Sequence, residues 1–116
     1  MAQVPLDGIL IDVPHSLAPD EVLREIEQFA QDLAENRFPD WGVRLERQDG
    51  RMQLRGAHDG SAFEATVVAE AGRVVLELTG VVEIGFLKHK LAGGDQGVRD
   101  RVRATLAETL SAHLGG

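Results

Sequence analysis

The stretch RLERQDGRMQLRGAHDGSAFEATVVAEAGRVVLEL, residues 44–78, decides the fold of this chain. Short turn dipeptides divide it at regular intervals: Asp49-Gly50, Asp59-Gly60 and Ala71-Gly72. Asp-Gly between two strand-like runs is a strong local signal for a β-hairpin, because it favours the positive backbone angles of a two-residue turn. The stretch therefore predicts four strands joined by three tight turns.

Pairing these strands through two-residue turns sorts their side chains onto two faces. One face collects Val43, Leu45, Met52, Leu54, Phe63, Ala65, Val67, Val74, Leu76 and Leu78. The other face collects Arg44, Glu46, Gln53, Arg55, Glu64, Thr66, Glu77 and Thr79. A slip of one residue would exchange the faces, so the pattern defines the register. It predicts a four-stranded antiparallel meander with one dry face and one solvated face.

The flanking segments supply one more strand and the helices. Apolar residues predict a strand over 9–13, and spacings of three and four predict an amphipathic helix over 17–36, with Ser16 as its N-cap. A second helix is expected after Asp95, which would be its N-cap, with an apolar residue at every fourth position: Val98, Val102, Leu106 and Leu110. Residues 81–97 are interpreted as a strand end running into a short helix, with a loop as the alternative. The fold class is α+β: the meander plus an N-terminal strand, with an N-terminal and a C-terminal helix covering one face.

Composition limits the class of protein. The 116 residues fit one domain, residues 1–116, and the absence of cysteine excludes disulfides, thiol catalysis and iron–sulfur clusters. The net charge of −7 opposes nucleic-acid binding, which needs a basic field. No apolar run is long enough for a transmembrane segment. The first residues lack the pattern of a signal peptide, so we expect a cytoplasmic protein.

No residue pattern points to catalysis. The four histidines, His15, His58, His89 and His113, lack metal-ligand spacing, and none of the three serines lies in a nucleophile elbow. The glycine-rich run at 93–97 lacks the Gly-Lys-Ser/Thr of a phosphate loop and is interpreted as a helix break. We therefore predict that the protein is not an enzyme and has no catalytic residue, cofactor or metal site.

The start of the chain carries a resemblance to a known family. Val13-Pro14-His15-Ser16-Leu17 followed by an amphipathic helix resembles the beginning of the small bacterial polyhydroxyalkanoic acid system proteins. The hairpin block at 44–78 and the tail from Phe86 onward are similar to that family in layout, whereas 38–42 has no counterpart. The resemblance implies a non-enzymatic accessory protein of polyhydroxyalkanoate (storage polyester) metabolism that associates with the granule. It implies no catalytic residues.

Residues 84–103 form the candidate docking surface for a granule or a partner protein. The apolar residues Phe86, Leu87 and Leu91 stand beside a concentration of positive charge in an acidic chain. An apolar strip with basic neighbours suits an amphiphilic or anionic surface. In the alternative, Phe86 and Leu91 close the core and the lysines lie around them. The basic residues are Lys88, Lys90, Arg99, Arg101 and Arg103.

Two further functions stay open. A curved antiparallel sheet held against a long C-terminal helix is similar in layout to START-like domains that bind small hydrophobic ligands. Such a function needs a cavity of roughly 300 Å³ or more, and the small inward residues Gly56, Ala65 and Ala69 would leave room for it. The other alternative is a homodimeric interaction protein, whose signature would be an exposed apolar patch around Val68 and Val75.

Overall fold

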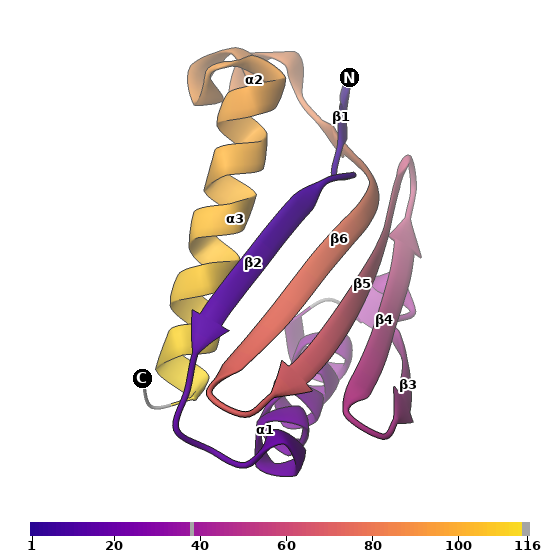
Figure 1. Ribbon diagram of the computed structural model, residues 1–116. Coiled ribbons are helices and arrows are strands. Elements are labelled where there is room, and N and C mark those ends of the chain that lie inside the picture. The colour runs from indigo at the N-terminus through magenta and orange to yellow at the C-terminus, as the bar shows by residue number, and fades with distance from the viewer. Residues whose placement is uncertain (38, 115–116) are drawn as a thin grey trace.

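The protein is one antiparallel sheet with helices on a single face (Figure 1). The computed structural model describes residues 1–37 and 39–114. The elements are β1 (Ala2–Pro5), β2 (Ile9–Pro14), α1 (Pro19–Asp32), η1 (Leu33–Arg37), η2 (Pro39–Trp41), β3 (Arg44–Gln48), β4 (Arg51–His58), β5 (Ser61–Glu70), β6 (Arg73–Ile84), α2 (Phe86–Ala92) and α3 (Gly94–His113). The strand order is β1-β6-β5-β4-β3, and β2 also pairs with β6. The predicted α+β class is confirmed.

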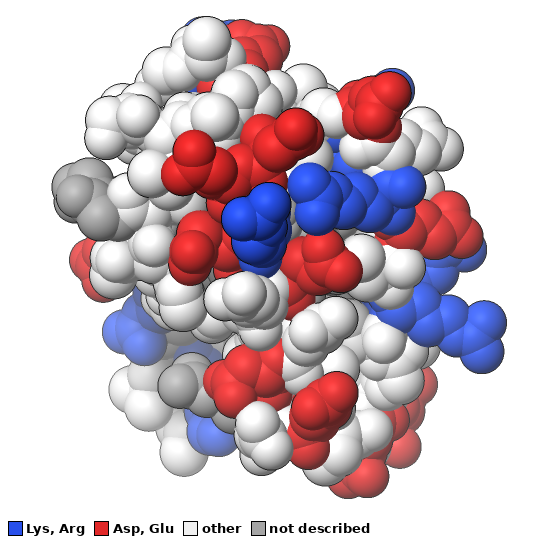
Figure 2. Space-filling model, turned by 90° about the horizontal axis from the view of Figure 1, so that it is seen from below, with Lys and Arg blue, Asp and Glu red and all other residues white. Residues whose placement is uncertain are grey.

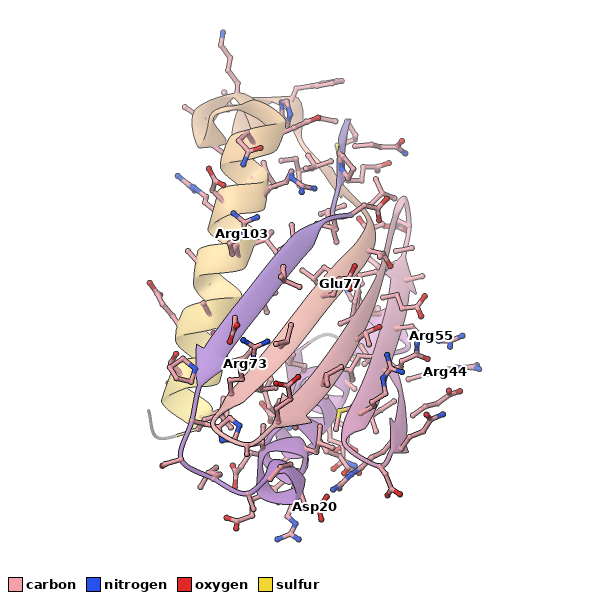
Figure 3. All side chains as sticks on the ribbon, viewed as in Figure 1. Asp20, Arg44, Arg55, Arg73, Glu77 and Arg103 are labelled. Carbon is pink, nitrogen blue, oxygen red and sulfur yellow. The ribbon has the colours of Figure 1, made fainter. Side chains whose placement is uncertain are left out.

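The register of the meander is as the sequence predicted. Leu45 lies opposite Leu54, Leu54 opposite Ala65, and Ala65 opposite Leu78. Figure 3 looks onto the outer face of the sheet, where Glu77 and Arg55 are exposed to solvent. The alternation of apolar and polar residues therefore decides which face meets the helices.

The three turns differ in their backbone angles from the two-residue hairpin turns that were expected. Only one residue in each turn has a positive φ: Gly50 at 70°, Asp59 at 51° and Gly72 at 86°. Ala71 therefore does not adopt the left-handed conformation, which its Cβ disfavours; Gly72 adopts it instead.

The N-terminal strand predicted at 9–13 is β2, and an additional strand, β1, precedes it. The two strands pair with different halves of β6: β2 with residues 73–78 and β1 with residues 81–84. Between those halves lies Gly80, whose N–H donates to Asp7 Oδ1 at 2.9 Å and whose carbonyl accepts from Leu6 N–H at 2.8 Å. Gly80 therefore marks the point where β6 changes partner.

Gly80 is expected to tolerate no side chain. Its φ is +118°, and a Cβ there would collide with the carbonyl oxygen of Ala62 on β5. Gly80→Ala should therefore lower the free energy of unfolding by about 2 kcal/mol or more, from backbone strain and the collision together. Chemical denaturation measures this loss.

Gly72→Ala is the matched control, because Gly72 has a φ of +86° but no heavy atom within 4 Å of the added Cβ. We expect it to cost about 1 kcal/mol from strain alone. Equal losses in the two variants would contradict the predicted collision at Gly80.

The first helix is shorter than predicted and lacks the predicted cap. It begins at Pro19 after Ala18, which makes no side-chain cap hydrogen bond, and ends at Asp32, where the π-helical turn η1 follows. Ser16 is exposed and is not the N-cap. Instead the Leu17 N–H donates to His15 Nδ1 at 3.2 Å. The proline offers no N–H to cap and has a helical φ, so the helix begins there without a serine.

The C-terminal part contains two helices. β6 ends at Ile84, and residues 86–92 form α2, so the short helix expected within 81–97 is confirmed and the loop alternative is wrong. Asp95 is not the N-cap of α3; that residue is Gly93, and Asp95 accepts instead from His89 Nε2 at 2.6 Å. α3 lies along β2 and β1 and covers that edge of the inner sheet face (Figure 1).

The core lies between the inner face of the sheet and the two long helices. α1 buries Val22, Leu23 and Ile26, while α3 buries Val98 and Leu110. The sheet contributes its fully buried inward residues, among them Ile9, Met52, Val67 and Val74. Because α1 and α3 cover different parts of the sheet, part of the inner face lies between them.

Candidate functional site

A cavity of about 400 Å³ lies between the inner face of the sheet, α1 and α3. Every strand from β4 to β6 contributes to it, together with η2 and the loop between β1 and β2. Its lining residues are Leu6, Ile26, Phe29, Ala30, Leu33, Trp41, Val43, Leu54, Phe63, Ala65, Leu76, Leu78, Val82, Val102, Leu106, Thr109 and Leu110.

The lining is almost entirely hydrocarbon. Among the lining residues that the structure describes there is no charged side chain, and their one hydroxyl, Thr109 Oγ1, donates to the carbonyl of Thr105 at 2.8 Å. A charged group brought into such a space would lose its hydration without gaining an ionic partner. The chemistry of the lining therefore selects uncharged, apolar molecules.

The cavity is not sealed from solvent. Phe29 and Leu33 on one side and Val102 and Leu106 on the other are half-buried, although all four line it. Trp41 and Phe63, which also line the cavity, are half-buried as well, so the cavity is open past several of its lining side chains.

The small residues that were expected to leave room on the inner face account for only part of the cavity. Ala65 lines the cavity between Leu54 and Leu78 on the neighbouring strands, as the sequence suggested. Gly56 leaves no room, because the Phe63 ring occupies the position a side chain would take: an added Cβ would lie 2.7 Å from a ring carbon. Ala69 is buried in the core but does not line the cavity.

Trp41 is a site residue that the sequence analysis did not identify. It lies on η2, lines the cavity, and its ring centroid is 6.1 Å from that of Phe63 and 5.7 Å from that of His58. It is the only tryptophan of the chain, so its fluorescence reports on the cavity. A lone tryptophan in the unmatched segment 38–42 was the available signal; Phe38 of that segment lies outside the described residues.

The four histidines lie in separate places. His15 is buried with its Nε2 atom unpartnered, and His58 lies 3.4 Å from Asp59. His89 contacts Asp95, and His113 lies against the Phe29 ring with 4.6 Å between centroids. Within residues 1–37 and 39–114, no group of three or more potential metal-ligating side chains occurs together.

The structure divides the candidate docking surface into two groups. Phe86, Leu87, Lys88 and Lys90 project from α2 and are exposed, as is Leu91. The alternative in which Phe86 and Leu91 close the core is wrong, since they are 69% and 74% exposed.

The arginines of the same surface lie along α3 and not on α2. Arg99 Nη1 donates to the Pro5 carbonyl at 2.6 Å, and Arg103 forms an ion pair with Asp100 at 3.6 Å. Arg101 is exposed farther along the helix. The positive rim next to the exposed apolar residues therefore consists of the two lysines.

The patch expected for a homodimer is small. Val68 and Val75 are paired and half-buried on the outer face, and in their row across the sheet they are flanked by Arg51 on one side and Asp12 on the other. Two valines between charged residues do not form a large apolar surface.

One edge of the sheet is β3, and its inner side carries a charge. Arg47 Nη1 contacts Glu27 Oε2 at 3.1 Å, and Arg47 Nη2 lies 4.0 Å from Asp20 Oδ1; both acids belong to α1. These ion pairs connect β3 to α1, next to the buried side chains of Met52 and Val67.

Comparison with known proteins assigns the chain to no family. No family model, no curated protein and no solved structure matches it. The resemblance to polyhydroxyalkanoic acid system proteins therefore stays a prediction. Of the helices in the described part of the chain, none has the length and apolar character needed to cross a bilayer.

Proposed function

We propose that this protein binds one small, uncharged and mainly apolar molecule in the cavity between the sheet, α1 and α3. The observation that carries the proposal is an open cavity of about 400 Å³ with a hydrocarbon lining. Ligand sites are typically concave, apolar and of roughly 300–1,000 Å³. A sealed core would instead have favoured the accessory role without a ligand.

The size and lining of the cavity indicate the class of ligand. An apolar cavity of about 150 Å³ is large enough to bind benzene. A cavity of about 400 Å³ accommodates something more than twice that size, such as a medium-length acyl chain or a bicyclic hydrocarbon. The described lining residues carry no charge, which favours a neutral compound over a free carboxylate.

The role in storage-polyester metabolism remains a second proposal, with the cytoplasmic and granule locations that accompany it. Its support is the sequence resemblance around Pro14-His15-Ser16-Leu17. A ligand-binding protein can also be an accessory protein, so the two proposals are compatible.

Energy transfer from Trp41 tests the cavity directly. The probe is N-phenylnaphthylamine, an uncharged apolar fluorophore that accepts excitation energy from tryptophan. We expect saturable one-to-one binding with quenching of Trp41, because the ring lines the cavity. Titration that never saturates would contradict a defined site.

A charged analogue supplies the matched control. Anilinonaphthalene sulfonate has a similar aromatic frame and adds a sulfonate, for which the described lining residues offer no cation. We expect it to bind at least roughly tenfold more weakly than the neutral probe. Equal affinities would show that the probes bind elsewhere on the surface.

A further inference from the structure

Exposed apolar side chains gather at the end of the molecule that carries α2. Among the described residues, five large hydrophobic side chains are exposed, and three belong to α2: Phe86 at 69%, Leu87 at 71% and Leu91 at 74%. A fourth, Met1 at 66%, precedes β1, whose first residue pairs with Ile84 just before α2. Figure 1 shows the N-terminus and α2 at the same end. We call Met1, Phe86, Leu87, Lys88, Lys90 and Leu91 the α2 tip.

The segment that contains α2 differs in charge from the protein as a whole. Residues 84–94 contain Lys88 and Lys90 and no acidic residue, whereas the whole chain has a net charge of −7. The nearby Asp95 carboxylate is occupied by His89. Acidic side chains dominate the end of the molecule that carries α1 (Figure 2). The α2 tip is therefore apolar and basic in an acidic protein.

The α2 tip is held in place by contacts to the neighbouring elements. His89 Nε2 lies 2.6 Å from Asp95 Oδ1, which joins α2 to the first turn of α3. Arg99 Nη1 donates to the Pro5 carbonyl at 2.6 Å, which joins α3 to β1. The apolar side chains are thus presented from a fixed backbone, so binding through them costs little ordering of the chain.

We propose that the α2 tip docks into the headgroup region of an anionic phospholipid bilayer. Apolar side chains with lysines beside them suit this interface, because the former enter the acyl boundary and the latter meet negative headgroups. The inference does not depend on the ligand cavity, which lies elsewhere in the fold.

A protein partner fits the α2 tip less well than a lipid surface does. A helix of seven residues is only about 10 Å long, whereas a stable protein interface buries about 800 Å² on each partner. In a symmetric contact between two copies, Lys88 and Lys90 would face the same lysines of the second copy with no acid of residues 84–94 between them. A bilayer needs no matching pocket and accepts a protruding tip.

Vesicle co-sedimentation tests the proposal with the full chain. The vesicles contain phosphatidylcholine alone, or phosphatidylcholine with about one-third phosphatidylglycerol as the anionic lipid. We expect binding to the anionic vesicles that weakens as salt is raised, and at least roughly tenfold weaker binding to the neutral ones. No binding of the parent protein to anionic vesicles would overturn the proposal.

Surface variants connect the binding to the α2 tip. Phe86→Ser with Leu87→Ser and Leu91→Ser, and separately Lys88→Glu with Lys90→Glu, should each weaken binding by roughly tenfold or more. Leu10→Ser is the control, because Leu10 is 55% exposed on β2 and outside the tip. All these positions are exposed, so the variants should keep the parent's thermal unfolding temperature.

The results distinguish binding to a bilayer from self-association of the protein. Unchanged vesicle binding in both tip variants would overturn the assignment of the surface. A parent protein that dimerises in sedimentation equilibrium, with tip variants that are monomeric, would also overturn it in favour of self-association. Moving the only tryptophan with Trp41→Phe and Phe86→Trp should give a blue shift of fluorescence on anionic vesicles, and an unshifted spectrum would contradict insertion.

Discussion

Val67→Asp should lower the free energy of unfolding by about 4 kcal/mol or more, which is a large part of the stability of an ordinary domain. Val67 has 0% of its surface exposed and lies between Met52 and Leu76 on the neighbouring strands. A carboxylate there would be removed from water beside hydrocarbon alone. Urea denaturation followed by circular dichroism measures the loss.

The adjacent position gives a matched control for the same chemical change. Val68 belongs to the same strand but lies half-buried on the outer face, opposite Arg51. Val68→Asp should cost no more than about 1 kcal/mol, and Glu77→Ala should cost still less, since Glu77 is exposed. Similar losses in Val67→Asp and Val68→Asp would show that the two faces of β5 are wrongly assigned.

Ala65→Phe should abolish ligand binding and leave the fold intact. Ala65 is 3% exposed and lines the cavity on its sheet side. A phenyl ring added there occupies the space that a ligand needs, and the ring itself buries apolar surface. We expect the affinity for N-phenylnaphthylamine to fall by roughly 100-fold, with unfolding stability within about 1.5 kcal/mol of the parent.

Ala62→Phe is the control for this change. Ala62 lies on the same strand, is exposed, and does not line the cavity. Its variant should bind the probe like the parent. A full affinity for the probe in Ala65→Phe would place the binding site outside the cavity, and the proposed function would fail with it.

The meander was predictable because most inward positions of its strands are apolar and each turn carries a glycine. Leu54 and Ala65 could be paired from residue spacing alone, and the structure pairs them. β1 gives no such pattern, since it has four residues and ends in a proline. Its strand conformation depends on pairing with residues 81–84, which are distant in the sequence.

The cavity was only partly predictable for a physical reason. Its volume depends on how far α1 and α3 lie apart on the sheet, and no local pattern encodes that distance. The expectation that Ala65 leaves space was correct. The same expectation for Gly56 was wrong, because the Phe63 ring fills the space beside it. Trp41 follows a π-helical turn and reaches the cavity from an irregular segment, where periodicity gives no information.

For the α2 residues, the composition of the surface could be predicted from the sequence, but their exposure could not. Their composition predicted an apolar and basic surface, but an apolar residue in a short helix is equally compatible with a place in the core. Exposure of Phe86 and Leu91 is decided by the direction in which α2 leaves β6. Gly85, with an extended backbone, connects β6 to α2, and the contact of His89 with Asp95 joins α2 to α3.

The ion pairs of Arg47 have a consequence for the protein at high concentration. β3 ends the sheet with unpaired backbone groups, and such an edge invites strands of other molecules to add and form aggregates. Arg47 places a charge on the inner side of this edge and is joined there to Glu27. A foreign strand would have to cover this pair with its own side chains and remove it from water. The arginine that fixes β3 to α1 thereby also protects this edge of the sheet against the addition of further strands.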